Sequence, residues 1–109
     1  MNQPANTRSA GSTEPALAAQ LTQEGLVPGR WSNGPDAVYS VHDHPYGKVL
    51  VVTAGSITFT IEGSSSRVVR MGPGDRLELP AHTPHSALVG PEGVVCLEAH
   101  LAAGNLHAS

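Results

Sequence analysis

The stretch His42-Asp43-His44-Pro45-Tyr46-Gly47-Lys48 places two histidines one residue apart in a chain of short apolar runs. Side chains on a β-strand alternate between its two faces, so residues i and i+2 point into the same space. A third histidine, His85, begins another strand-like segment. If the sheet curls into a barrel, the three histidines can meet. Three neutral imidazoles around one cavity suit a divalent transition metal and leave coordination positions open.

Outward from this stretch, the chain alternates apolar segments with turn residues. Twelve glycines and nine prolines separate the segments, for example at Ala54-Gly55 and at Gly90-Pro91-Glu92-Gly93. The predicted strands are Leu26–Trp31, Ala37–His44, Lys48–Thr53, Ser56–Glu62, Arg67–Met71, Arg76–Leu79, His85–Val89 and Val94–Leu101. About eight short strands predict an all-β fold, a single antiparallel jelly-roll β-barrel.

A short helix is predicted before the first strand. Thr13 can cap its N-terminus, Pro15 falls in its first turn, and Gly25 can end it. Leu17 and Leu21 are four residues apart and form one apolar stripe. We therefore expect this helix to pack on the outside of the barrel.

The chain of 109 residues is short enough for one domain. We expect a disordered tail at 1–12, the folded domain at 13–101 and a loose tail at 102–109, since neither end shows apolar periodicity.

Composition narrows the partners and the compartment. A net charge of −3 and a pI near 6.0 give no basic surface for nucleic acid. No run of about 18 apolar residues is present, so no membrane span is expected. Cys96 is the single cysteine, and the N-terminus has no apolar signal segment. These features predict a cytoplasmic protein.

Two segments together resemble the two sequence motifs of the cupin family. His42, His44 and Gly55 follow the spacing of the first motif, H-x-H-x3,4-E-x6-G. Gly74, Pro80 and His85 follow the second, G-x5-P-x-G-x2-H-x3-N. The resemblance extends from Asp36 to about Leu101, and it implies the jelly-roll barrel predicted from the strand pattern.

The resemblance implies that His42, His44 and His85 are the metal ligands, because cupins usually bind their metal through these positions. The sequence departs from the motifs at four other positions. Asp36 and His82 stand where the family has glycine, Lys48 where it has a glutamate ligand, and Val89 where it has asparagine.

Lys48 is the departure with the largest chemical consequence. An ammonium group has no lone pair to give a metal and repels a divalent cation. We expect Lys48 to face the cavity, with its nitrogen either carried to the barrel mouth or turned toward an anionic substrate. A site of three neutral histidines should bind metal less tightly than one that includes a glutamate.

The cavity that holds the metal should also hold a small molecule. The residues predicted to line it, besides Lys48, are Val38, Ser40, Leu50, Val52, Phe59, Leu77, Leu79 and Ala87. On the last strand, Glu98 and His100 share a face with Cys96, while the opposite face is more apolar. We therefore expect Glu98 and His100 outside the barrel or at its rim, His82 exposed in a loop, and Cys96 as a small core residue. If the face with Cys96 looks inward instead, Glu98 or His100 could hydrogen-bond to the metal ligands or replace one of them.

The residues and the resemblance leave two hypotheses about the function of the protein. The first is an enzyme that uses iron, nickel, manganese or zinc for oxygen-dependent oxidation or metal-assisted rearrangement of a small polar molecule. The second is a non-catalytic module that binds a small molecule. We also expect a homodimer, with Trp31 and the strand Ser56–Glu62 supplying apolar contacts.

Overall fold

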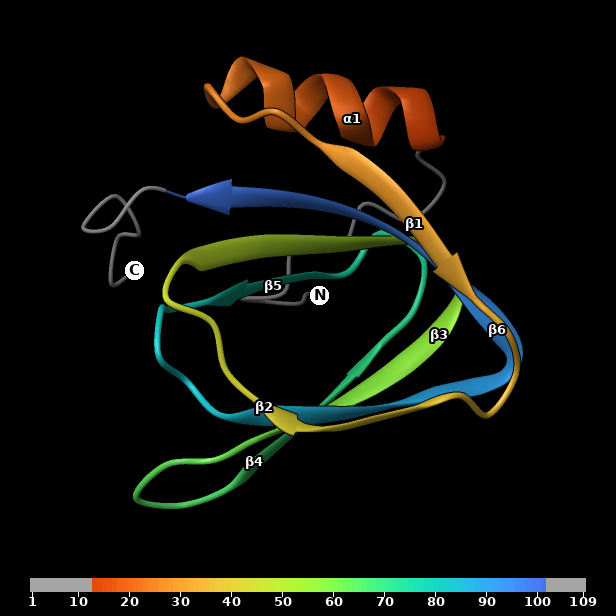
Figure 1. The fold of residues 1–109 in the computed structure, drawn as a ribbon. Helices are drawn as coiled ribbons and strands as arrows, with labels where there is room; N and C mark the ends of the chain where they lie inside the picture. Colours follow the sequence, from red (N-terminus) through yellow and green to blue (C-terminus); the bar gives the residue numbers. More distant parts are fainter. Residues whose placement is uncertain (1–12, 102–109) are drawn as a thin grey trace, which may run out of the picture.

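The computed structural model describes residues 13–101 (Figure 1). The tails predicted at 1–12 and 102–109 lie outside the described residues. Within 13–101, no helix is long and apolar enough to cross a membrane.

The predicted helix forms as α1, Glu14–Gln23. Thr13 caps it, because its hydroxyl oxygen accepts a hydrogen bond from the backbone N–H of Ala16 at 3.3 Å. Past the helix end, Gly25 adopts a left-handed φ of +85°. Leu17 and Leu21 are buried, so the predicted apolar stripe is the packed face.

Within the described residues, six strands form instead of the eight predicted. They are β1 (Gly29–Asn33), β2 (Val38–His42), β3 (Gly47–Ile61), β4 (Arg67–Met71), β5 (Arg76–Leu79) and β6 (His85–Leu101). All pairings are antiparallel, which confirms the all-β jelly-roll class. The difference in number arises because β3 and β6 each join two predicted strands.

The two long strands pair along their whole length and run through two layers (Figure 1). In one layer, the first half of β3 and the second half of β6 lie between β5 and β1. In the other layer, the second half of β3 and the first half of β6 lie between β4 and β2. The described strands thus form one sheet that bends over on itself, and the site lies between its layers.

The sheet bends where turns were expected. At Ala54-Gly55 the register of β3 against β6 shifts twice, between Val52 and Ala54 and again between Gly55 and Ile57. Irregular pairing of this kind lets a strand bend without ending. Gly55 is therefore a bend residue within β3, and the prediction that Ala54-Gly55 separates two strands was wrong.

Both faces of the layer that contains β1 and β5 are buried. Between the layers lies a core of Leu50, Val52, Ile57, Phe59, Met71, Leu77, Ala87, Val89, Val94 and Cys96. On the outer face, α1 covers a second cluster, made of Leu17, Leu21, Val49, Val51 and Leu97. The apolar face of the last strand, with Leu97, is thus buried under the helix, and the face with Cys96 looks into the space between the layers.

Candidate metal centre

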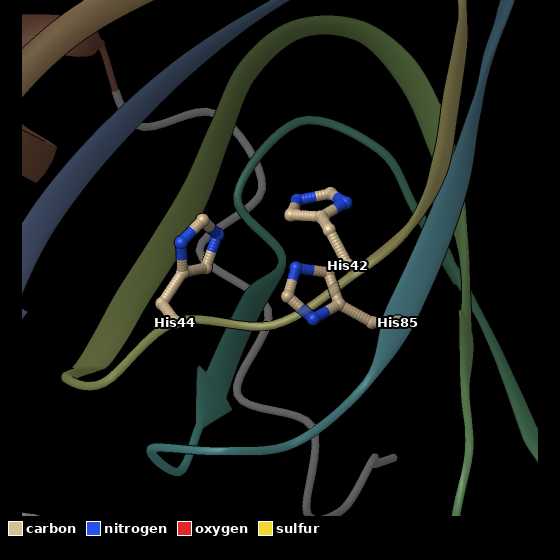
Figure 2. A group of neighbouring side chains, drawn as sticks. All are labelled: His42, His44 and His85. Carbon is tan, nitrogen blue, oxygen red and sulfur yellow. The ribbon is translucent and has the colours of Figure 1, made fainter.

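The three predicted histidines come together at one end of the space between the layers (Figure 2). His42 ends β2 and is the cross-strand partner of His85, which begins β6. His44 was expected within the same strand as His42, but it lies in the segment that joins β2 to β3. One nitrogen from each ring can be chosen so that all three lie within 4.8 Å of one another. The three histidines are therefore positioned to bind a metal.

Backbone carbonyls orient two of the rings. His42 Nδ1 donates to the carbonyl of Ser40 at 2.6 Å, and His85 Nδ1 donates to the carbonyl of Thr83 at 2.7 Å. A proton on Nδ1 leaves the lone pair on Nε2, as in histidines that bind metals. His85 Nε2 is buried and has no hydrogen-bond partner among the described residues. An unpartnered buried nitrogen beside two other imidazoles fits a metal ligand.

Local electrostatics favour neutral rings. Burial, followed by the charge of Lys48, lowers the pKa of His44 below its ordinary value of 6.5. Burial is also the main cause that lowers the pKa of His85, with smaller contributions from His42 and Lys48. A neutral imidazole keeps the lone pair that a metal needs, so the donor set fits a divalent transition metal.

The loop before β6 supports His44. The backbone N–H of His82 donates to the carbonyl of His44 at 2.7 Å, and the ring of Tyr46 stacks on that of His44 with centroids 5.0 Å apart. The side chain of His82 is exposed, as expected.

Cys96 is buried, and burial raises the pKa of its thiol to about 12, which suits a core residue.

A cavity of about 370 Å³ opens beside the histidines. Its walls are formed by Trp31, Ser32, Tyr39, His42, His44, Tyr46, Lys48, Leu50, Ile57, Phe59, His85, Ala87 and Glu98. Of the residues predicted to line it, Lys48, Leu50, Phe59 and Ala87 do so. Val52, Leu77 and Leu79 are instead buried elsewhere in the sheet.

Ser40 and Val38 were wrongly assigned to the cavity. Val38, Ser40 and His42 are spaced two residues apart, so regular alternation would place them on one face. However, the pairing of β2 with β6 shifts between Tyr39 and His42. This irregularity puts Tyr39 on the cavity side and leaves Ser40 and Val38 exposed. The sequence carried no recognisable sign of the shift.

Glu98 lies in the cavity wall, so the expectation that it lies outside the barrel was wrong. Its side chain lines the cavity, and its Oε1 lies 3.5 Å from Lys48 Nζ. Trp31 Nε1 donates to Glu98 Oε1 at 3.1 Å, and His100 Nε2 donates to Oε2 at 2.7 Å. Burial would raise the pKa of Glu98, but the hydrogen bond from His100 and the charge of Lys48 outweigh burial and lower it. Alternation from the buried Cys96 was the available signal for its inward position.

Lys48 faces the cavity, as predicted from its place in the motif. Its side chain is 11% exposed, and Nζ lies 3.5 Å from His44 Nε2 as well as from Glu98. The nitrogen is therefore held inside the cavity by a carboxylate of the chain itself.

Comparison with known proteins identifies the family. The family model described as a cupin domain matches residues 29–99, and the chain belongs to the cupin family. The sequence matches no curated protein.

Several solved structures share the fold. Bacillus subtilis oxalate decarboxylase, a protein with Mn(II) centres, is 25% identical with a TM-score of 0.64, over 75% of this chain and 22% of that one. The DMSP lyase DddQ from Ruegeria pomeroyi DSS-3 is 24% identical with a TM-score of 0.62, over 75% of this chain and 41% of that one. The Drosophila melanogaster CENP-C cupin domain is 15% identical with a TM-score of 0.63, over 68% and 59%. This chain thus spans less than half the length of the first two proteins.

Proposed function

We propose that this protein is a metal-dependent cupin in which His42, His44 and His85 hold one divalent transition metal. The observation that carries the proposal is the buried, unpartnered Nε2 of His85, which faces two other imidazoles. Iron, nickel, manganese and zinc all accept such a ligand set. The Mn(II) centres of the similar oxalate decarboxylase support a divalent ion of this kind.

We further propose an enzyme that acts on a small polar molecule by oxygen-dependent oxidation or metal-assisted rearrangement. A bound metal would supply Lewis acidity or redox capacity. The chain would supply a cavity of about 370 Å³ whose apolar walls exclude water and whose polar groups orient the substrate. The second candidate, a non-catalytic binding module, is favoured by Lys48, which stands where the family has an anionic metal ligand.

Metal content tests the site. Protein purified without a histidine tag should contain about one transition-metal ion per chain, and His85→Ala should lose most of it. The exposed His82 gives a matched control, because His82→Ala should keep the metal. Full metal content in His85→Ala, measured by elemental analysis, would contradict the assignment. Oxygen uptake by the iron-loaded protein with candidate substrates would then separate the oxidative enzyme from the binding module.

Two further parts of the proposal concern the protein in the cell. We propose a homodimer, and we propose a cytoplasmic location based on the single, buried Cys96. We propose a dimer contact other than the one expected from Trp31 and the strand Ser56–Glu62. Ile57 and Phe59 are buried between the layers, and Trp31 lines the cavity, so these side chains are not available to a partner.

A further inference from the structure

Lys48 is the only lysine in the chain, and it is buried in the wall of the candidate metal cavity. The five arginines would serve equally well for surface charge, so this ammonium is unusual in both type and place. Burying a charge is unfavourable unless the charge meets a group of opposite sign. The contacts of Lys48 therefore indicate what the cavity is built to hold.

Lys48 is held loosely, whereas its partner is held firmly. Both contacts of Lys48 Nζ, to Glu98 Oε1 and His44 Nε2, are 3.5 Å long, at the outer limit for a hydrogen bond. Glu98 has two shorter bonds, from His100 at 2.7 Å and from Trp31 at 3.1 Å. The carboxylate of Glu98 thus keeps two donors if Lys48 turns away, so Lys48 can exchange Glu98 for another anion.

The charges of the cavity favour such an exchange. Among the described residues that line it, Lys48 and Glu98 carry the only formal charges when the histidines are neutral, and these two cancel. A divalent cation on three neutral imidazoles would add two positive charges that no lining residue balances. A ligand with a negative group would compensate them in part, in surroundings where water screens charge poorly.

We propose that the cavity selects a small carboxylate, which takes the place of Glu98 as the partner of Lys48 beside the three histidines. The remaining walls indicate the rest of the ligand. Leu50, Ile57 and Phe59 are apolar, and the volume is about 370 Å³, which suits a short hydrocarbon body. This inference rests on the proposed metal site, and it assigns Lys48 as the residue that determines specificity for charge.

Binding can be followed without any knowledge of the reaction. Trp31 is the only tryptophan in the chain; it lines the cavity and donates to Glu98, so its fluorescence should report a ligand that displaces Lys48 from Glu98. The zinc-loaded protein is suitable because Zn²⁺ has no redox chemistry. Lactate and lactamide form a matched pair of probes, since they have the same number of heavy atoms and differ in charge.

Two variants should change the preference for lactate over lactamide in opposite directions. Lys48→Met should weaken lactate binding about ten-fold, the effect of one lost charged hydrogen bond, and should weaken lactamide binding much less, because a neutral amide oxygen is a poorer partner for an ammonium group. The preference of zinc itself for carboxylates is present in both the parent and Lys48→Met, so it cancels when their lactate affinities are compared. Glu98→Gln removes the internal competitor and should tighten lactate binding. Lys48→Gln is a second neutral replacement, and zinc content shows whether each variant is folded.

Three results would overturn the inference. If the parent protein binds no zinc, the proposed metal site fails and this inference fails with it. If zinc binds but lactate affinity is the same in the parent, Lys48→Met and Lys48→Gln, the inference fails alone. If lactate and lactamide weaken equally in both neutral variants, Lys48 shapes the cavity without selecting charge.

Discussion

Backbone angles near the site explain the glycines of the cupin motifs residue by residue. The two motifs place glycine at four positions, and all four have a left-handed φ in this structure. The φ angles are 62° at Asp36, 72° at Gly55, 89° at Gly74 and 59° at His82. Glycine adopts this conformation without steric cost, while other residues pay for it. The two substitutions in this sequence thus keep the backbone shape at the expense of local strain.

Replacing His82 with glycine should make the protein more stable. Relief of the left-handed strain is worth about 1–2 kcal/mol, and the greater freedom of glycine in the unfolded chain offsets about 0.5–1 kcal/mol of it. A net gain of about 0.5–1 kcal/mol would raise Tm by several degrees. His82→Ala is the matched control, because it removes the imidazole and keeps the Cβ. Equal stabilities of the two variants in urea unfolding would contradict the explanation.

At the scale of elements, the continuity of β3 and β6 depends on close backbone contact at their bends. A Cβ added to Gly55 would lie 2.0 Å from the carbonyl oxygen of Gly93, which is itself at a φ of 80°. This crowding allows the two strands to bend together from one layer into the other.

Gly55→Ala should therefore be strongly destabilising. The new methyl group meets backbone that cannot move aside, and alanine disfavours the φ of 72°, so we expect a loss of about 3 kcal/mol or more. Gly72→Ala is the control, because no atom of residues 13–101 beyond its chain neighbours lies within 4 Å of its Cβ position, and its effect should stay within about 0.5 kcal/mol. Denaturant unfolding measures both variants, and similar midpoints would disprove the role of the bend.

The same elements show what the sequence could and could not predict. Motif spacing correctly brought His42, His44 and His85 together and placed Lys48 in the cavity. Alternation could not say which face of β6 looks inward, because α1 buries the other face too, and Glu98 was misplaced for that reason. Turn residues correctly predicted where the chain changes direction. They could not distinguish a bend within a strand from a turn between two strands, because glycine is favoured in both.

At the scale of the whole molecule, the two layers differ in what covers them. Helix α1 covers the layer that contains β1 and β5 (Figure 1). On the other layer, Val38 of β2 and Leu88 of β6 are cross-strand neighbours, 73% and 51% exposed, and Val68 of β4 is exposed too. The pair Val38 and Leu88 is the exposed apolar contact that a second copy would cover in the proposed homodimer.

A charge on this face should separate the dimer. We expect light scattering to give a dimer mass for the parent at micromolar concentration and a monomer mass for Leu88→Glu, because a carboxylate cannot be buried there without a partner. Val27 is 86% exposed in the segment between α1 and β1, so Val27→Glu is the control and should remain dimeric. A parent that elutes as a monomer, or a Leu88→Glu protein that stays dimeric, would rule out this interface.

The long pairing of β3 with β6 also determines how the chain can fold. Its inner end joins Ile61 to His85 and its outer end joins Gly47 to Leu101, so every rung lies between residues far apart in sequence. Closing the loop that contains β4 and β5 loses chain entropy before any rung is gained. The loop is shortest at the inner end, so pairing should begin there and proceed outward through the bend. We therefore expect a protein built on this pairing to fold slowly for its length, and its third candidate ligand, His85, lies where pairing should begin.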